Sequence, residues 1–553
     1  MLPNFSSICA RVGLPVGLLA LTALALLFRL PDLGSVPPGL YGDEAWNGVD
    51  ALRSLNQGWW QIIYPGNFGR EGGMIWLQAI SLHLFGISIE SLRLPAALVG
   101  ALTVPALALF ARELCLWLGQ DKRIATLIGL FAGAALAVSF WHVNFSRIAF
   151  RAILDPLIFC SGSALLIHAF RTTNWRPTNH AGPTVWWKPA PRWRQSRRAI
   201  LIATLAGLVL GSGLYGYPAY RLLALPVIGL ILIRIWKNGQ SWRLRWQRGS
   251  DDSVLASCII GALVTAAPIV LLWADDPSLL VARQDMAIWA KPDPWAEFLT
   301  SSSKLASMYL GQGDMLWRHN YAGDPALGPA MQVPFIGGLI LLAVGLVISR
   351  TRAICAMLLL WGLAAHLPAA LTWGDPPHML RSLNAVAWAA TICALPLAAL
   401  LRIFKGRKQM IRLVICMGCL TIAYTGVKTH DRYFNDWPAQ AGTAREFMQA
   451  ENRMLDQVIT EAQAGATILI LADVNTPETL YWRWALQVPL FRFAAATQGN
   501  PDLADHLLIL PQSAPWTDNL PTPPSRILTI DPLPAQRRAE LTQYYPEALW
   551  QTY

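Results

Sequence analysis

The strongest constraint in this sequence is the recurrence of long apolar segments that lack acidic and basic residues. A helix of about 17 to 25 such residues crosses the hydrocarbon core of a bilayer. Only 14% of the 553 residues are charged, whereas soluble domains have about a quarter. We therefore predict an all-α polytopic membrane protein with about eleven transmembrane helices, at residues 13–28, 94–111, 124–141, 152–170, 199–216, 217–233, 254–273, 332–349, 353–372, 385–401 and 413–427.

Basic residues are concentrated in alternate short loops of this arrangement. Six loops together contain 23 Lys and Arg residues and four acidic residues. By the positive-inside rule these loops are cytoplasmic, so the N-terminus is predicted inside and the C-terminus outside. The six loops are residues 1–12, 112–123, 171–198, 234–252, 350–352 and 402–412.

The charge also divides the chain into two parts. Residues 1–428 carry a net charge of +17 and residues 429–553 carry −6, which gives the total of +11. The basicity therefore reports membrane orientation, and no nucleic-acid partner is expected. The tryptophan-containing basic loop 171–198 suits contact with anionic membrane lipids.

Two regions are predicted from these patterns. Residues 1–428 form a transmembrane module with external loops at 31–93 and 274–331. Residues 429–553 alternate helical and strand-like patterns, beginning with a helical stretch at 444–463 and a strand-like stretch at 466–473. This alternation is typical of a small α/β domain, which we expect to be extracytoplasmic.

Charged side chains at the outer ends of the spans are the candidates for chemistry. Asp43 and Glu44 follow a Pro-Pro-Gly turn, and Asp155 lies within an otherwise apolar span, where an ionisable residue is functional by default. Each arginine alone suits an interfacial anchor. Together, acids and guanidinium groups on one side of the membrane suit phosphate binding and proton transfer. The accompanying residues are Arg70, Glu71, Arg147, Arg151, Tyr217, Arg221, His378 and Arg381.

The order of these motifs resembles the GT-C superfamily of integral-membrane glycosyltransferases, in particular its protein O-mannosyltransferase and aminoarabinose-transferase branch. The matching pieces cover most of residues 1–428 and read FRLPDL, GLYGDEAWNGVDAL, NFGREGG, LFGISIESLRLPAAL, FSRIAFRAILDPL, GYPAYR and HMLRSLN. The resemblance implies a polyprenyl-phosphate sugar donor, a catalytic role for Asp43, and a multi-pass location in the plasma (inner) membrane of a prokaryote. The aminoarabinose branch has Lys-Pro-Pro where this chain has Arg70-Glu71-Gly72-Gly73.

The chemistry of such a transfer suits the residues present. A phosphate leaves as an anion, so one base is sufficient, unlike the two carboxyl groups of glycoside hydrolysis. We expect Asp43 to be the general base of an inverting hexosyl or pentosyl transfer, with Glu44 orienting it or contacting the sugar. Asp155 would hold the acceptor, the sugar or a cation, and arginines would neutralise the phosphate. The acceptor hydroxyl can belong to a protein, a lipid or a glycan.

No cofactor is expected to be required, although magnesium or manganese at Asp43, Glu44 and Asp155 is an open alternative. His142, His319 and His378 lie in predicted external regions without paired ligand spacing, so we expect structural or interfacial roles for them. A second open alternative is a transporter or flippase of lipid-linked sugars. Such proteins tend to have charged groups near the membrane midplane, whereas here the candidates lie at one face.

Overall fold

The fold is described from a computed structural model of the chain. It describes residues 5–117, 119–172, 192–237, 250–281, 284–349, 351–374, 376–473, 483–513, 523–530 and 533–552. The predicted basic loops 171–198 and 234–252 fall largely outside these residues. The chain forms two compact units, one of residues 1–29, 97–146 and 151–432, and a second of residues 30–96, 147–150 and 433–553.

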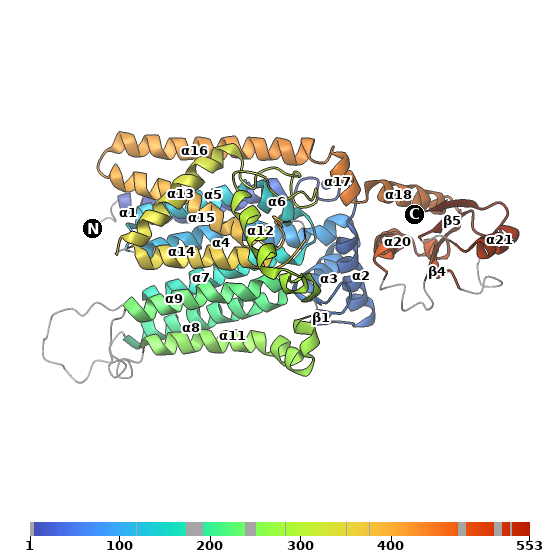
Figure 1. Ribbon diagram of the computed structural model, residues 1–553, viewed down its shortest axis with the longest axis horizontal. Helices are drawn as coiled ribbons and strands as arrows, with labels where there is room; N and C mark the ends of the chain where they lie inside the picture. The colour runs from blue at the N-terminus through green and yellow to red at the C-terminus, as the bar shows by residue number, and fades with distance from the viewer. Residues whose placement is uncertain are drawn as a thin grey trace. The chain divides into compact units, whose positions relative to one another are not determined.

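The first unit is a bundle of long apolar helices, many of which run side by side in Figure 1. Helix α4 (Ile89–Trp117) has residues in both units. The other helices are α1 (Phe5–Arg29), α5 (Lys122–Ala137), α6 (Phe140–Arg147, whose last residue is in the second unit), α7 (Leu154–Thr172), α8 (Arg192–Ser212), α9 (Ala224–Lys237), α11 (Ser250–Asp275), α12 (Pro294–Ser307), α13 (Pro329–Val347), α14 (Arg352–Ala370), α15 (Ala385–Ile403) and α16 (Lys408–Asp431).

Small residues allow close packing between helices of this bundle. A Cβ atom at Gly207 of α8 would lie 1.9 Å from the Cys258 carbonyl oxygen of α11, and one at Gly261 would lie 2.4 Å from the Thr204 carbonyl oxygen. Close approach through small residues is typical of helix pairs in membranes, where van der Waals packing drives association.

The prediction of a polytopic helical protein is confirmed. Among the described residues, eight helices are each long and apolar enough to cross a membrane, and the pair α5 and α6, bent by 60°, makes up to nine. The two other predicted spans coincide with shorter apolar helices, at Gly13–Arg29 and Pro218–Ile233. Each of the eleven predicted segments therefore overlaps an apolar helix.

The second unit begins with the segment that follows α1. It contains α2 (Gly42–Gln57), a hairpin of β1 (Ile63–Tyr64) and β2 (Arg70–Glu71), and α3 (Gly73–Phe85). Its C-terminal part contains α17 (Ala441–Glu446), α18 (Gln449–Gln463), α20 (Gln487–Gly499) and α21 (Ala535–Tyr544), together with four strands.

The four strands form one parallel sheet in the order β4-β3-β5-β6. They are β3 (Ile468–Ala472), β4 (Leu507–Pro511), β5 (Arg526–Thr529) and β6 (Leu549–Thr552). All five residues of β3 are buried, as expected for a central strand of a parallel sheet whose two faces are covered. The predicted C-terminal α/β fold is therefore confirmed.

The compact units differ from the predicted division at residue 428. The structure groups the loop predicted at 31–93 with the C-terminal segment, because one hydrophobic cluster joins them. Val49 of α2 and Ala79 of α3 pack in the same cluster as Leu455, Ile470 and Phe491. Hydropathy alone did not reveal this shared core, since its members are separated by several hundred residues.

Candidate active site

Asp43 lies in the first turn of α2, in the second unit. The preceding Gly42 allows the indole of Trp484 to approach, because a Cβ atom at Gly42 would lie 2.3 Å from the Trp484 ring. The Trp484 Nε1–H donates a hydrogen bond of 3.0 Å to Asp43 Oδ1. Glycine is therefore needed here for a close contact that holds the carboxylate.

A second donor reaches the same oxygen of Asp43. Asn67 lies in the turn between β1 and β2 with φ = +52°, a left-handed conformation that asparagine tolerates better than most residues. Its Nδ2 donates a hydrogen bond of 3.1 Å to Asp43 Oδ1. None of the described residues donates a hydrogen bond to Oδ2, and the side chain is half-buried. One oxygen of this carboxylate is thus fixed, and the other is available to a ligand.

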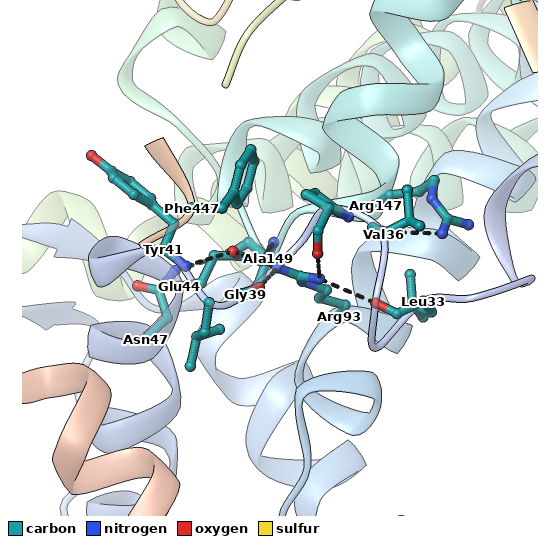
Figure 2. A network of polar contacts seen from close by, with 12 residues as sticks. Leu33, Val36, Gly39, Tyr41, Glu44, Asn47, Arg93, Arg147, Ala149 and Phe447 are labelled. Atoms are coloured by element: carbon teal, nitrogen blue, oxygen red, sulfur yellow. Dashed lines mark hydrogen bonds and ion pairs between the residues drawn. The ribbon is translucent and has the colours of Figure 1, made fainter. Parts of the chain in front are cut away.

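Glu44, the next residue, is completely buried and held on both oxygens (Figure 2). Arg93 Nε lies 2.9 Å from Oε1 and Arg93 Nη2 lies 3.0 Å from Oε2. The Ala149 N–H also donates to Oε1, at 2.9 Å, and the Tyr41 N–H donates to Oε2, at 3.2 Å. The last contact caps the start of α2. With both oxygens occupied, Glu44 has no free lone pair directed at a sugar or a metal in this arrangement.

Arg93 extends this network into the loop after α1. Its Nη1 donates to the Leu33 and Pro37 carbonyl oxygens, and its Nη2 donates to the Gly39 carbonyl oxygen at 2.7 Å (Figure 2). The side chain is fully buried. Arg93 therefore fixes the path of the segment that leads to Asp43.

Arg70 is buried in a second network and is a poor candidate for the predicted phosphate contact. Its Nη2 forms an ion pair with Asp50, and its Nη1 donates to Asn47 Oδ1 at 2.6 Å. Its Nε donates to the Gly66 carbonyl oxygen, which fixes the β1–β2 turn. Burial raises the pKa of Asp50, and the positive charge of Arg70 partly offsets this effect. Arg70 would have to leave these partners to bind phosphate.

Two other predicted residues of the second unit are also buried. Arg147 Nη2 donates to the Val36 carbonyl oxygen at 2.9 Å (Figure 2), and its guanidinium lies over the rings of Tyr433 and Phe434. Glu71 lies in β2, opposite Ile63. Arg147 thus contacts the same loop that Arg93 holds.

Asp155 belongs to the first unit and lies in the first turn of α7. Its Oδ1 accepts a hydrogen bond of 3.1 Å from the Tyr217 N–H, and its Oδ2 accepts one of 3.4 Å from Asn384 Nδ2. Gly216 permits the first contact, because a Cβ atom there would lie 2.5 Å from Oδ1. The buried carboxylate fastens the turn before Tyr217.

Two of the three predicted arginines of the first unit, Arg151 and Arg221, lie against aromatic rings. The Arg151 guanidinium lies 5.2 Å from the ring centroid of Tyr217, the residue whose N–H donates to Asp155. Arg221 lies 4.5 Å from the Trp273 ring centroid and donates to the Leu280 carbonyl oxygen. Arg381 donates to the Trp373 carbonyl oxygen at 3.0 Å. All three side chains are buried or half-buried, and burial strengthens the cation–π contacts of Arg151 and Arg221.

His378 lies in a group that sequence reasoning missed. Asp314, His319 and His378 each offer one ligand atom, and these atoms lie within 4.8 Å of one another. Burial holds the pKa of His378 well below its usual value, and nearby His319, Arg381 and Arg318 lower it further. This cluster could hold a metal ion. The cation alternative at Asp43, Glu44 and Asp155 is not supported at Glu44, whose oxygens already face Arg93.

The sequence drew attention to His142, but it did not single out several other residues of these networks. His142 Nδ1 lies 2.7 Å from Arg29 Nη2 in the first unit, which agrees with the structural role expected for it. The missed residues are ordinary polar side chains whose partners the sequence does not indicate. They are Asn47, Asp50, Asn67, Arg93, Asp314, Asn384 and Trp484. All of them except Asp314 and Trp484 lie in segments that carry the family resemblance.

Comparison with family models and with curated proteins gave no match. Among solved structures, archaeal oligosaccharyltransferase AglB from Archaeoglobus fulgidus, in complex with an inhibitory peptide and a dolichol-phosphate, is 14% identical with a TM-score of 0.46. The match covers 86% of this chain and 60% of that chain, so this chain spans less than two thirds of AglB.

ArnT from Cupriavidus metallidurans bound to undecaprenyl phosphate is 13% identical, with a TM-score of 0.52. The match covers 97% of this chain and 89% of that chain. It therefore includes both the helical bundle and the C-terminal α/β part. The chain therefore has the fold of ArnT, which agrees with the fold expected from the family resemblance of its motifs.

Proposed function

We propose that this chain is a membrane glycosyltransferase that moves a sugar from a polyprenyl-phosphate donor to a hydroxyl acceptor. Two findings support the proposal. The chain shares its fold with ArnT, whose structure contains undecaprenyl phosphate. The acidic residue implicated by the GT-C resemblance, Asp43, also has a geometry suited to receiving a proton.

The geometry of Asp43 carries the proposal. Trp484 and Asn67 hold Oδ1, so the carboxylate plane is fixed before a ligand arrives. Oδ2 receives no hydrogen bond from the described residues, and the Asp43 side chain is half-buried. A fixed carboxylate with one free oxygen is what a general base requires, because catalysis depends on placing the accepting atom near the proton.

One base is sufficient for the transfer, because the leaving group needs no proton. The acceptor oxygen attacks the anomeric carbon while the bond from that carbon to the phosphate oxygen breaks. The acceptor proton moves to Asp43 Oδ2, and the electron pair of the broken bond leaves with the polyprenyl phosphate as an anion. A single displacement of this kind inverts the anomeric centre.

Glu44 and Arg93 act in this proposal as positioning residues. Glu44 holds the start of α2 through Tyr41 and Arg93, while Arg93 holds the preceding loop through three carbonyl oxygens. Arg70 has a similar part, since it fixes the turn that carries Asn67. These three side chains support Asp43 without contacting the sugar.

The residues of the first unit are proposed for donor binding. Arg151, Arg221 and Arg381 are the candidates for neutralising the phosphate, because guanidinium groups pair well with phosphate oxygens. Asp155 fixes the turn that carries Tyr217, beside Arg151. Its proposed role is to position these two side chains, which is narrower than the predicted contact with acceptor, sugar or cation.

The proposed reaction takes place on the extracytoplasmic face of the plasma (inner) membrane. The positive charge of the six basic loops supports a cytoplasmic location for those loops, and therefore an external location for the loop containing Asp43 and for the α/β part. The acceptor is a protein, lipid or glycan of the cell envelope. The transfer itself needs no metal ion in this scheme, because the leaving phosphate is neutralised by arginine.

An assay in detergent tests the proposed activity against transport. The purified full chain is mixed with radiolabelled polyprenyl-phosphate sugars and an envelope extract as the source of acceptors, and release of polyprenyl phosphate is measured together with label in the extract. We expect stoichiometric release and transfer without a sealed membrane. Movement of the donor across proteoliposomes, with no release in detergent, would instead establish the flippase alternative.

A further inference from the structure

A cluster of metal-ligating side chains lies in the first unit, outside the residues assigned to transfer. Asp314 and His319 belong to the segment between α12 and α13, and His378 belongs to the segment between α14 and α15. Asp314 and His319 are fully buried, and His378 is half-buried. The cluster therefore joins two separate connecting segments of the same unit.

The spacing of the ligand atoms is close to that of a coordination shell. Asp314 Oδ2 lies 2.9 Å from His319 Nδ1, and the ligand atoms of all three residues lie within 4.8 Å of one another. Ligands about 2 Å from a tetrahedral zinc ion lie roughly 3.3 Å apart. Small side-chain movements would thus be sufficient to close the three ligands around one ion.

The surroundings already orient these side chains. The Leu316 N–H donates to Asp314 Oδ1 at 2.9 Å, and the Met379 N–H donates to Asp314 Oδ2 at 2.7 Å. The His319 ring lies 4.8 Å from the His378 ring and 5.5 Å from the Phe145 ring, measured between centroids. Outer contacts of this kind hold ligands in place and limit solvent access.

The three ligand atoms determine which class of metal ion suits the site. Two imidazole nitrogens and one carboxylate suit zinc and similar divalent transition metals, whereas magnesium and calcium prefer oxygen ligands only. The positive side chains of Arg318 and Arg381 also lie near His378. They disfavour a cation held by charge alone, so binding here depends on coordination by nitrogen.

We propose that Asp314, His319 and His378 bind one zinc-type divalent metal ion, which fastens the segment between α12 and α13 to the segment between α14 and α15. Three protein ligands leave a fourth position for water. The role is structural and does not depend on the proposed glycosyl transfer. His378 also lies six residues before Asn384, whose amide contacts Asp155, so the ion would stabilise the segment that carries this contact.

Metal content and thermal unfolding of the full chain test the site. The protein is purified in detergent without a histidine tag, stripped with chelator, dialysed against zinc and analysed by mass spectrometry. We expect about one zinc per chain and a rise in the unfolding midpoint, since binding only to the folded state stabilises it. A large excess of magnesium should leave the bound zinc in place.

Two histidine variants distinguish this site from adventitious binding. His378→Gln should lose the zinc and its stabilising effect while keeping the midpoint of the metal-free wild type. His83→Gln is the matched control, because His83 is exposed on α3 in the other unit; it should bind zinc like the wild type. Equal zinc content in all three proteins, or none in the wild type, would overturn the proposal.

Cobalt provides a measurement that does not depend on a variant folding. Cobalt added to the stripped wild-type protein should give the visible absorption of a four-coordinate site with nitrogen and oxygen ligands, and one equivalent of zinc should remove it. A spectrum of hydrated, six-coordinate cobalt would contradict the site, whatever the variants show. Neither measurement uses sugar transfer, so failure here is separate from failure of the proposed enzyme activity.

Discussion

The starts of α2 and α7 each place an aspartate in the first turn of a helix, but the two carboxylates have different surroundings. Asp43 is half-buried, with both of its hydrogen bonds on one oxygen. Asp155 is buried, with a donor on each oxygen. The comparison teaches that residue type and helical position do not define the role of an acidic residue. The hydrogen-bond donors around each carboxylate oxygen define that role.

The same contrast exists between two adjacent residues. Glu44 accepts four hydrogen bonds and pairs with Arg93, whereas Asp43 leaves Oδ2 without a donor from the described residues. A sequence motif of two consecutive acids therefore contains one residue suited to structure and one suited to chemistry. Variants can separate these two roles, because a structural role affects the unfolding midpoint and a chemical role affects the transfer rate.

The largest effect on stability is expected for Glu44→Gln. This change leaves the buried Arg93 guanidinium without its counter-charge, and breaking one partner of a buried ion pair costs about 3–5 kcal/mol. We expect a clear fall in the thermal unfolding midpoint in detergent. Asp43→Asn is the matched control, since it alters a half-buried acid and should cost about 1 kcal/mol or less. Equal midpoints for the two variants would break the comparison.

A smaller loss of stability is expected for Gly216→Ala. The added methyl group would lie 2.5 Å from Asp155 Oδ1 and force the turn before Tyr217 to shift, at a cost of about 1–3 kcal/mol. Gly328→Ala is the control, because a Cβ atom there meets nothing within 4 Å and its φ is −60°. The two unfolding midpoints are compared. If Gly216→Ala matched the control, Asp155 would not fasten this turn tightly.

The smallest effect is expected for Trp484→Phe. This change removes one of the two donors to Asp43 Oδ1 but keeps an aromatic ring beside Gly42. The lost hydrogen bond, which orients the carboxylate, is worth about 1 kcal/mol. A rise of this size in the activation free energy corresponds to roughly a fivefold fall in the transfer rate. The rate is measured at saturating donor, with the unfolding midpoint as the control. An unchanged rate would mean that Asn67 alone orients the carboxylate.

Much of the fold could be predicted because it depends on local patterns. Apolar segments revealed the helices of the bundle, and the alternation after residue 428 revealed the C-terminal α/β part. The common core of α2, α3 and the C-terminal segment could not be predicted in this way. Val49 and Phe491 meet in that core, and no local pattern connects residues so distant in the sequence.

The candidate site was only partly predictable for the same reason. Asp43 was identified because it belongs to a recognisable motif. The donor Asn67 and the ion-pair partner Arg93 lie in segments that carry the resemblance, but their contacts exist only in the folded chain. Arg70 is a residue for which the sequence suggested a role that its contacts do not support. Its position near the acidic residues suggested phosphate binding, whereas in the structure it forms an ion pair with Asp50.

The most direct test of the central claim is the transfer rate of Asp43→Asn with a polyprenyl-phosphate sugar that the wild type uses. Asparagine keeps an oxygen for the Trp484 and Asn67 donors but cannot accept the acceptor proton as a base. We predict a fall of about 100-fold or more, with an unfolding midpoint close to that of the wild type. Transfer at the wild-type rate by the folded variant would contradict the assignment of Asp43 as the base.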